Sequence, residues 1–214
     1  SANVALPDIA GDLAIDAVLL NWIPLAFLTA AAMLVLAFGR LADMYGRKRV
    51  MLDGTIAVII TSVLAASATD ATWLIIFRLL QGASAATSLV TVISVVSSAM
   101  PAESRGRAFG LVASTVYFGL SVGPVVAGIV IDLAGWRWAF LIHLPFAVIA
   151  LYVGVAVVKI DWQAERRGRF DLAGAIIYAS AIVALACGIA MLPSVKATLL
   201  LLTALAGFVL FVRV

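Results

Sequence analysis

Charged and titratable residues are scarce in this chain of 214 residues: only 12% are charged, and one histidine and one cysteine occur. Water-soluble domains carry about 25% charged residues, so the composition excludes an ordinary soluble fold. The single cysteine, Cys187, cannot form a disulfide within the chain. One histidine and one cysteine cannot supply the ligands of a zinc site, and we expect no bound metal.

The sequence also lacks the motifs of the common enzyme classes. It contains no glycine-rich loop that ends in Lys followed by Ser or Thr, which a phosphate-binding loop requires. The one histidine, His143, does not accompany a serine nucleophile in a stretch that suits a soluble catalytic domain. We therefore expect that the chain is not an enzyme and needs no cofactor. Any uphill process would draw on an ion gradient rather than on ATP.

Hydrophobic residues, by contrast, make up 65% of the chain, and the mean hydropathy is +1.20. They are gathered into blocks, each near the roughly 20 apolar residues that a helix needs to cross about 30 Å of hydrocarbon. No alternation typical of barrel strands occurs, and helices satisfy their own backbone hydrogen bonds inside a bilayer. The sequence therefore predicts an all-α, polytopic membrane helix bundle with spans at 19–38, 50–68, 73–99, 108–131, 138–158, 172–191 and 197–212.

The first residues, SANVALPDIAGDLA, have the apolar beginning and acidic end of a helix that leaves the membrane. We expect the chain to begin within its first span, so that this span is incomplete. Neither a secretory signal nor a transit peptide is recognisable at this end. The spans themselves would direct insertion into the membrane.

Basic residues fall almost entirely in alternate joints between the blocks. Because Lys and Arg in short loops are retained on the cytoplasmic side, this asymmetry predicts the orientation. Eleven of the 14 basic residues share that side: Arg40, Arg47, Lys48, Arg49, Arg105, Arg107, Lys159, Arg166, Arg167, Arg169 and Arg213. The joints 39–49, 100–107 and 159–171 should face the cytoplasm, and 8–18, 69–72, 132–137 and 192–196 the outside. Divided in this way, the basic residues suit a lipid surface and not a nucleic acid.

The first cytoplasmic joint, GRLADMYGRKRV at residues 39–50, combines charge with glycine. Asp43 stands four residues before Arg47, so the two side chains can pair if that part is helical. Gly39 and Gly46 would allow two helices to turn back tightly, because glycine adopts backbone angles that other residues avoid. The spacing is more specific than a basic loop requires.

Arg78 and His143 both stand within predicted spans. A guanidinium at the centre of a span costs about 2.5 to 3.5 kcal/mol on insertion scales, so Arg78 should face a partner or a watery cavity. The polar stretch that follows, which contains Gln81, favours a cavity wall. Extension of the Arg78 side chain to the outer interface is the alternative. His143 is the one side chain that titrates near neutrality without help, and its position favours a packing role over a proton relay.

The span at 108–131 carries small residues on one face. The residues Thr115, Gly119, Gly123 and Ala127 recur every four positions. Such a stripe lets another helix approach closely, although ordinary helix packing would use the same residues. Pro124 removes a backbone donor and should bend the helix.

Four segments together resemble the major facilitator superfamily, and within it the drug:proton antiporter branch with fourteen spans. They are NVALPDIAGDL, GRLADMYGRKR, RLLQGASAA at 78–86 and GLSVGPVVAGIVIDLAGWRWAF, in the order and spacing of that branch. The resemblance implies an N-terminal half plus two additional helices. Residues 1–158 would form the six-helix bundle with an incomplete first span, 159–171 a cytoplasmic linker and 172–214 the inserted pair. The C-terminal half would be absent from this sequence.

The resemblance also implies a function. It is that of a secondary active transporter in the inner or plasma membrane, exporting lipophilic or cationic small molecules in exchange for protons by alternating access. Arg78 and Gln81 would serve proton coupling or the substrate cavity. The cytoplasmic gating loop would comprise Gly39, Asp43, Gly46, Arg47, Lys48 and Arg49. The antiporter motif would comprise Gly119, Gly123, Pro124 and Gly128.

Two positions depart from the pattern of that branch. Ala127 stands where a glycine is usual, and His143 stands where relatives often have asparagine. These differences bear on proton coupling more than on the fold. Two alternatives stay open: a metabolite facilitator of the same fold, and a non-transporting helix module that acts through partners or through self-association.

Overall fold

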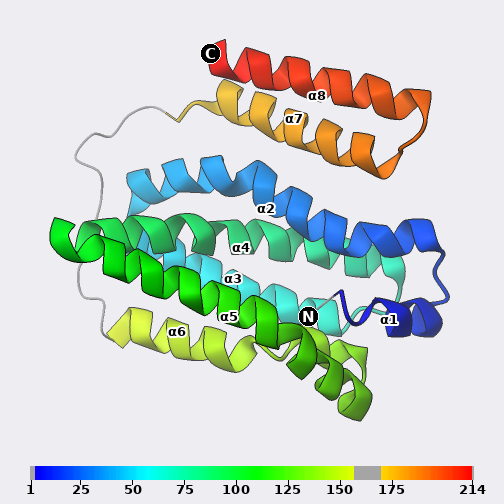
Figure 1. Ribbon diagram of the computed structural model, residues 1–214, viewed down its shortest axis with the longest axis horizontal. Coiled ribbons are helices and arrows are strands. Elements are labelled where there is room, and N and C mark those ends of the chain that lie inside the picture. The colour runs from blue at the N-terminus through cyan, green and yellow to red at the C-terminus, as the bar shows by residue number, and fades with distance from the viewer. Residues whose placement is uncertain (1–2, 157–169, 214) are drawn as a thin grey trace.

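The computed structural model describes residues 3–156 and 170–213, and this part of the chain contains helices and no strands. The elements are α1 (Leu6–Leu13), α2 (Ala17–Tyr45), α3 (Arg47–Ala66), α4 (Ala71–Ala99), α5 (Ala102–Ala134), the 3-10 helix η1 (Trp136–Phe140), α6 (Leu144–Ala156), α7 (Leu172–Ala190) and α8 (Val195–Arg213) (Figure 1). The all-α prediction is confirmed. Within the described residues, 7 helical segments are long and apolar enough to cross a membrane, one for each predicted block.

Polar residues determine where several spans begin. The carboxylate of Asp16 accepts a hydrogen bond from the Leu19 amide at 2.8 Å, at the start of α2. Asp70 does the same for α4 at 3.0 Å, and Asp171 for α7 at 2.8 Å. A side chain at this position satisfies one of the amides that have no partner within the helix. The sequence thus marks these helix ends with single acids.

The helices extend beyond the apolar blocks, and this corrects two predicted joints. Only Gly46 separates α2 from α3, so the expected loop 39–49 is almost entirely helical. The joint 100–107 is likewise helical from Ala102 onward. The end of an apolar block marks the bilayer surface and not the end of a helix, because Arg, Leu, Ala and Met all favour helix.

The span predicted at 138–158 differs in the opposite way, because its α-helix begins later than the apolar block. Residues 138–158 were expected to form one helix, but the chain forms the 3-10 helix η1 first and becomes α-helical only at Leu144. Pro145 follows at the second position of α6, where the lack of an amide hydrogen costs nothing. The break places His143 between two helical elements rather than inside one.

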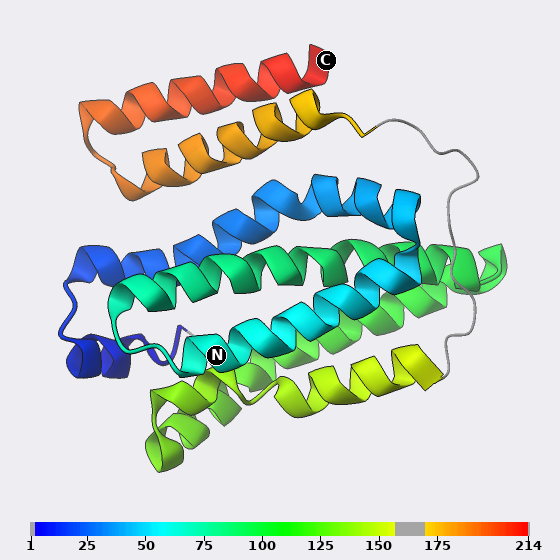
Figure 2. The same cartoon turned by 180° about the vertical axis from the view of Figure 1, so that it is seen from behind.

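The helix α4 is the centre of the bundle. It packs against both α2 and α3, while α3 in turn contacts η1 and α6 (Figures 1 and 2). Two glycines allow this close contact. A Cβ atom at Gly54 would overlap the side chain of Thr87, and one at Gly82 would overlap the backbone carbonyl of Phe27. The helices α7 and α8 form a hairpin that packs on α2 through α7.

Consecutive helices run in opposite directions, so the predicted cytoplasmic joints gather at one end of the bundle. The ends of α2, α4 and α8 and the starts of α3, α5 and α7 lie at that end (Figure 1). This is the arrangement that the distribution of basic residues requires. Of those basic residues, Lys159, Arg166, Arg167 and Arg169, together with most of the predicted linker 159–171, lie outside the described residues.

Candidate functional site

Arg78 of α4 is buried, with only 7% of its surface exposed. Its Nε donates a hydrogen bond to the backbone carbonyl of Ile23 in α2 at 3.2 Å, and one terminal nitrogen donates to Oε1 of Gln81 at 2.6 Å. Both partners are themselves buried inside the bundle. The alternative in which Arg78 extends to the outer interface is therefore wrong.

The charge of Arg78 is stabilised by neutral groups and is not neutralised by an acid among the described residues. Its guanidinium carbon lies 4.3 Å from the centroid of the Phe27 ring and 5.7 Å from that of Phe140. Aromatic faces attract cations through their negative quadrupole. None of the ion pairs formed among the described residues includes Arg78. The site therefore holds a buried cation, and its positive charge acts on any charged group that enters the space beside it.

Gln81 extends this contact to two further elements. Its Nε2 donates to Oγ of Ser62 in α3 at 2.7 Å, and the same hydroxyl lies 2.9 Å from Nε2 of His143. Ser62 is fully buried and Gln81 is nearly so. Arg78, Gln81, Ser62 and His143 thus form one continuous chain of hydrogen bonds, which we call the Arg78 chain.

Sequence reasoning found the first half of the Arg78 chain and missed the second. Ser62 received no role, and His143 was interpreted as a packing residue. The available signal was that His143 is the one histidine of a chain with few titratable groups. Nothing in the spacing indicates that residue 143 meets residue 62, because such a contact between distant helices depends on the tertiary fold.

The Arg78 chain borders a cavity of about 420 Å³. Polar groups enter it from Arg78, Gln81 and His143, and Phe27 supplies an aromatic wall. The complete lining is Asn3, Pro24, Phe27, Leu28, Val58, Arg78, Gln81, Ala85 and His143. A mainly apolar pocket with a few convergent polar groups is the usual form of a small-molecule site. The predicted cavity at Arg78 and Gln81 thus has a counterpart in the structure.

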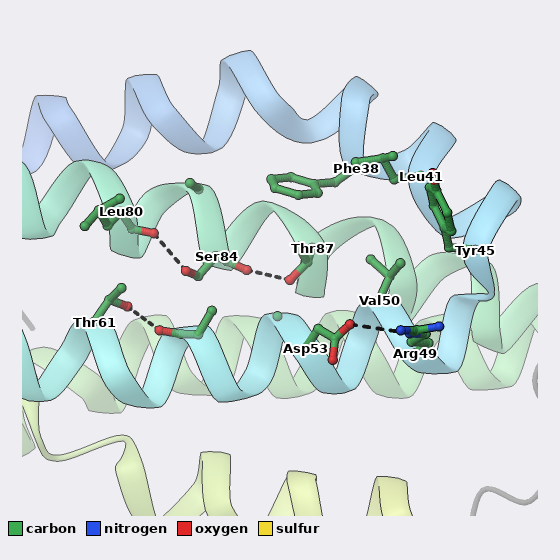
Figure 3. A pocket seen from close by; sticks show the side chains of 13 residues that line it. Phe38, Leu41, Tyr45, Arg49, Val50, Asp53, Thr61, Leu80, Ser84 and Thr87 are labelled. Atoms are coloured by element: carbon green, nitrogen blue, oxygen red, sulfur yellow. Dashed lines mark hydrogen bonds and ion pairs between the residues drawn. The ribbon is translucent and has the colours of Figure 1, made fainter. Parts of the chain in front are cut away.

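A second cavity, of about 680 Å³, is bounded by α2, α3 and α4 nearer the end with the basic joints (Figure 3). Besides the phenol of Tyr45, three aliphatic hydroxyl groups line it. Each of the three donates to a carbonyl of its own helix: Thr61 to Ala57 at 2.7 Å, Ser84 to Leu80 at 2.8 Å and Thr87 to Ser84 at 2.6 Å. Their donor hydrogens are therefore occupied. The cavity offers apolar contact, with the exposed Arg49 and Asp53 at its edge (Figure 3).

The predicted cytoplasmic cluster is only partly brought together. A terminal nitrogen of Arg47 lies 2.9 Å from Oδ1 of Asp43, which confirms the pairing expected from their spacing. Arg47 also donates to the backbone carbonyl of Ser94 at 3.2 Å and to the hydroxyl of Ser98. Both serines belong to the last turns of α4, where the helix dipole favours a cation. One guanidinium therefore joins α2, α3 and α4.

The remaining residues of that cluster have separate surroundings. Gly46 has a φ of 106°, a backbone angle that favours glycine, and it forms the turn as predicted. Gly39 lies inside α2 and faces Val90, so its predicted part in the turn is wrong. Lys48 follows in the first turn of α3, and Arg49 lies on an exposed surface 4.0 Å from Asp53.

The small-residue stripe of α5 does not receive another helix in the described structure. A Cβ atom at Gly119 or Gly123 would meet no atom within 4 Å, and one at Gly128 would meet only the Val4 side chain, at 4.0 Å. Of the stripe, only Ala127 is buried. The expected close helix contact occurs instead at Gly54 and Gly82, on α3 and α4. Pro124 lies within α5, which runs unbroken from Ala102 to Ala134.

A polar contact that the sequence does not predict lies at the end of the bundle opposite the basic joints. Oδ2 of Asp12 accepts hydrogen bonds from Nε1 of Trp136 at 2.9 Å and from Arg137 at 2.8 Å. These two donors stabilise the carboxylate and hold the pKa of Asp12 below its ordinary value. The contact connects α1 to η1, outside the long helices.

Comparison with known proteins gives a consistent result. A sequence model described as the Major Facilitator Superfamily matches residues 1–212. The chain is 33% identical to the multidrug resistance protein Stp of Mycobacterium tuberculosis over 98% of its own length and 40% of that protein. It is 31% identical to the riboflavin transporter RibZ of Clostridioides difficile, over 83% of this chain and 39% of that protein.

A third relative is the probable actinorhodin transporter of Streptomyces coelicolor, which is 33% identical over 86% of this chain and 32% of that protein. The chain thus spans at most about two fifths of the length of these curated relatives. The residues that the family model matches, 1–212, contain the Arg78 chain, the Asp43–Arg47 pair and α5.

Proposed function

The chain belongs to the major facilitator superfamily, whose members are membrane transporters and not enzymes, and on this premise we propose that it forms part of a proton-coupled exporter of small molecules. Its substrates would be lipophilic or cationic compounds, and protons would move in the opposite direction. The names of two relatives, a multidrug resistance protein and a probable actinorhodin transporter, support export. The membrane would be the inner or plasma membrane.

The observation that carries this proposal is the burial of Arg78 among neutral partners beside a cavity. A buried guanidinium stabilises the ionised form of any acid that approaches it and repels a second cation. A proton bound in the cavity would add a second positive charge there, so protonation of the cavity and binding of a cationic substrate oppose each other. A protein with this property can exchange one for the other.

Alternating access would supply the movement. We propose that residues 1–158 act as one bundle that rocks against a second half around a site near the midplane. The contact of Arg47 with Asp43, Ser94 and Ser98 would hold the cytoplasmic end in one of the two states. The linker 159–171 would connect this bundle to the α7–α8 pair at 172–214, and α5, with Gly119, Gly123, Pro124 and Gly128, would face the moving partner.

Proton release on substrate addition tests the proposal. The full-length gene product, reconstituted in liposomes that contain a pH-sensitive dye, should exchange protons for added ethidium. Arg78→Ala should reduce this exchange by about tenfold or more, since one hydrogen bond to a charged group contributes about 1.5 to 3 kcal/mol and a loss of about 1.4 kcal/mol corresponds to a factor of ten. Arg78→Lys, which keeps the charge but loses the planar contacts, should lie between the two. Unchanged exchange in Arg78→Ala would remove the role of Arg78, and absence of exchange in the wild type would contradict the function.

A metabolite facilitator of the same fold is the second candidate, and the similarity to a riboflavin transporter favours it. The same liposomes distinguish the two functions. A facilitator would equilibrate riboflavin without a pH gradient and without proton release, whereas an exchanger would require the gradient for accumulation.

A further inference from the structure

We propose that His143 is a proton-binding residue of the exchange, linked to Arg78 through Ser62 and Gln81; this inference rests on the proposed function. His143 lies in the break between η1 and α6 and lines the same cavity as Arg78. The imidazole therefore meets the cavity on one side and the buried hydroxyl of Ser62 on the other. A residue that takes up and releases protons needs both access and a partner that tolerates both of its charge states.

Ser62 is such a partner, because of how its single hydrogen can be used. Its Oγ lies 2.6 Å from the backbone carbonyl of Val58, 2.7 Å from Nε2 of Gln81 and 2.9 Å from Nε2 of His143. The amide nitrogen of Gln81 only donates, so Ser62 accepts there. The hydroxyl hydrogen is left for either the Val58 carbonyl or the imidazole.

Both protonation states of His143 fit this arrangement. When Nε2 of neutral His143 carries no hydrogen, Ser62 donates to it. When Nε2 carries one, as it always does in the imidazolium, it donates to Ser62, and the Ser62 hydrogen turns to the Val58 carbonyl. In each case the bond from Gln81 to Ser62 is kept. The Arg78 chain thus accommodates a proton on His143 by reversing one hydrogen bond.

The charge that the proton adds is what affects the substrate. Among the described lining residues of this cavity, Arg78 of α4 is the one charged side chain, and the groups contributed by α2 and α3 do not titrate. Protonation of His143 would place a second positive charge in the cavity with Arg78. A cationic substrate would then be repelled by both groups. The proton on His143 and the substrate in the cavity therefore oppose each other's binding by charge repulsion, without direct contact between them.

Substitution by glutamine tests this directly. His143→Gln replaces the imidazole with an amide, which can donate to or accept from Ser62 but cannot bind a proton near neutrality. Binding of ethidium to the purified full-length protein should weaken as the pH falls. For one opposing proton the affinity decreases by at most about tenfold per pH unit below the titration point. In His143→Gln, the affinity should stay within about twofold between pH 5.5 and 7.5.

Two further variants make the result decisive. His143→Asn should flatten the pH profile in the same way, and it replaces His143→Gln if that protein does not fold. Ser62→Ala removes the link but keeps the imidazole, so the affinity for ethidium should still depend on pH and proton release should persist, because linkage makes the two equivalent, but the midpoint of both should shift along the pH axis. An unchanged pH profile in both His143 variants would overturn the inference. If wild-type protein shows no proton release with ethidium, the proposed function itself fails, which is a different result.

Discussion

At the scale of single residues, a few buried polar side chains determine the chemistry of the candidate site. Removing a guanidinium from water costs several kcal/mol, and Arg78 recovers part of this through a carbonyl, an amide oxygen and two aromatic rings. None of these partners carries a charge. The cation is therefore held in place without being neutralised, and it can respond to a charge that enters the cavity.

Asp12 gives a prediction that concerns stability rather than transport. Its pKa is lowered from 3.8 by the hydrogen bonds from Trp136 and Arg137. A lowered folded-state pKa means that the carboxylate stabilises the fold above about pH 4, and that this contribution is lost as the pH falls through the folded-state value. Asp12→Asn should therefore lower the Tm at pH 7, and the difference from wild type should shrink toward pH 3.

Thermal unfolding in detergent at both pH values measures this effect. Asp8→Asn, on the same short helix, is the matched control and should leave the Tm unchanged at each pH. A difference between Asp12→Asn and wild type that is the same at pH 7 and pH 3 would contradict the assigned cause.

Residue-scale prediction from sequence succeeded where the cost of burial is decisive. The free-energy cost of an arginine inside a membrane was sufficient to predict that Arg78 borders a cavity. The four-residue spacing was sufficient to predict that Asp43 pairs with Arg47. The partners Ser62 and Ser94 could not be predicted. Both are ordinary serines in apolar helices, and their roles arise only when α3 and α4 lie side by side.

At the scale of helices, close approach depends on glycines that the sequence does not distinguish from others. Gly54 and Gly82 allow α4 to lie against α3 and α2, yet neither belongs to a stripe of small residues as clear as that of α5. The stripe gave the more conspicuous pattern but no contact among the described residues. Periodicity predicts that a face is suitable for close packing, and only the fold decides whether a neighbour is present.

Gly82→Ala should therefore destabilise the protein. The new Cβ would overlap the Phe27 carbonyl, and backbone cannot move aside as a flexible side chain can. Overpacking of this kind costs about 1 to 3 kcal/mol, which thermal or denaturant unfolding in detergent would detect. Gly110→Ala, at a position of α5 with no atom within 4 Å, is the control and should be neutral or slightly stabilising. Equal stability of the two variants would contradict the close contact of α2 and α4.

At the scale of the whole molecule, the sequence predicted the number of spans because the thickness of a bilayer fixes their length. It could not predict where the helices stop, since their ends extend beyond the bilayer into water. It also could not predict that α6 begins after a 3-10 turn, which is what brings His143 to Ser62. The candidate site was thus predictable as one arginine and one glutamine, and its extension was not.

The orientation of the bundle in the membrane provides the last prediction. If the basic joints face the cytoplasm, Arg105 at the start of α5 and Lys196 at the start of α8 must lie on opposite sides, because these helices begin at opposite ends of the bundle (Figure 1). Both side chains are exposed, so a cysteine at either position can react. In a Cys187→Ala background, a membrane-impermeant maleimide added to intact cells should label Lys196→Cys and should label Arg105→Cys only after the cells are lysed. Labelling of Arg105→Cys in intact cells would reverse or abolish the assigned orientation, and with it the proposal that Arg47 and Asp43 act at the cytoplasmic end.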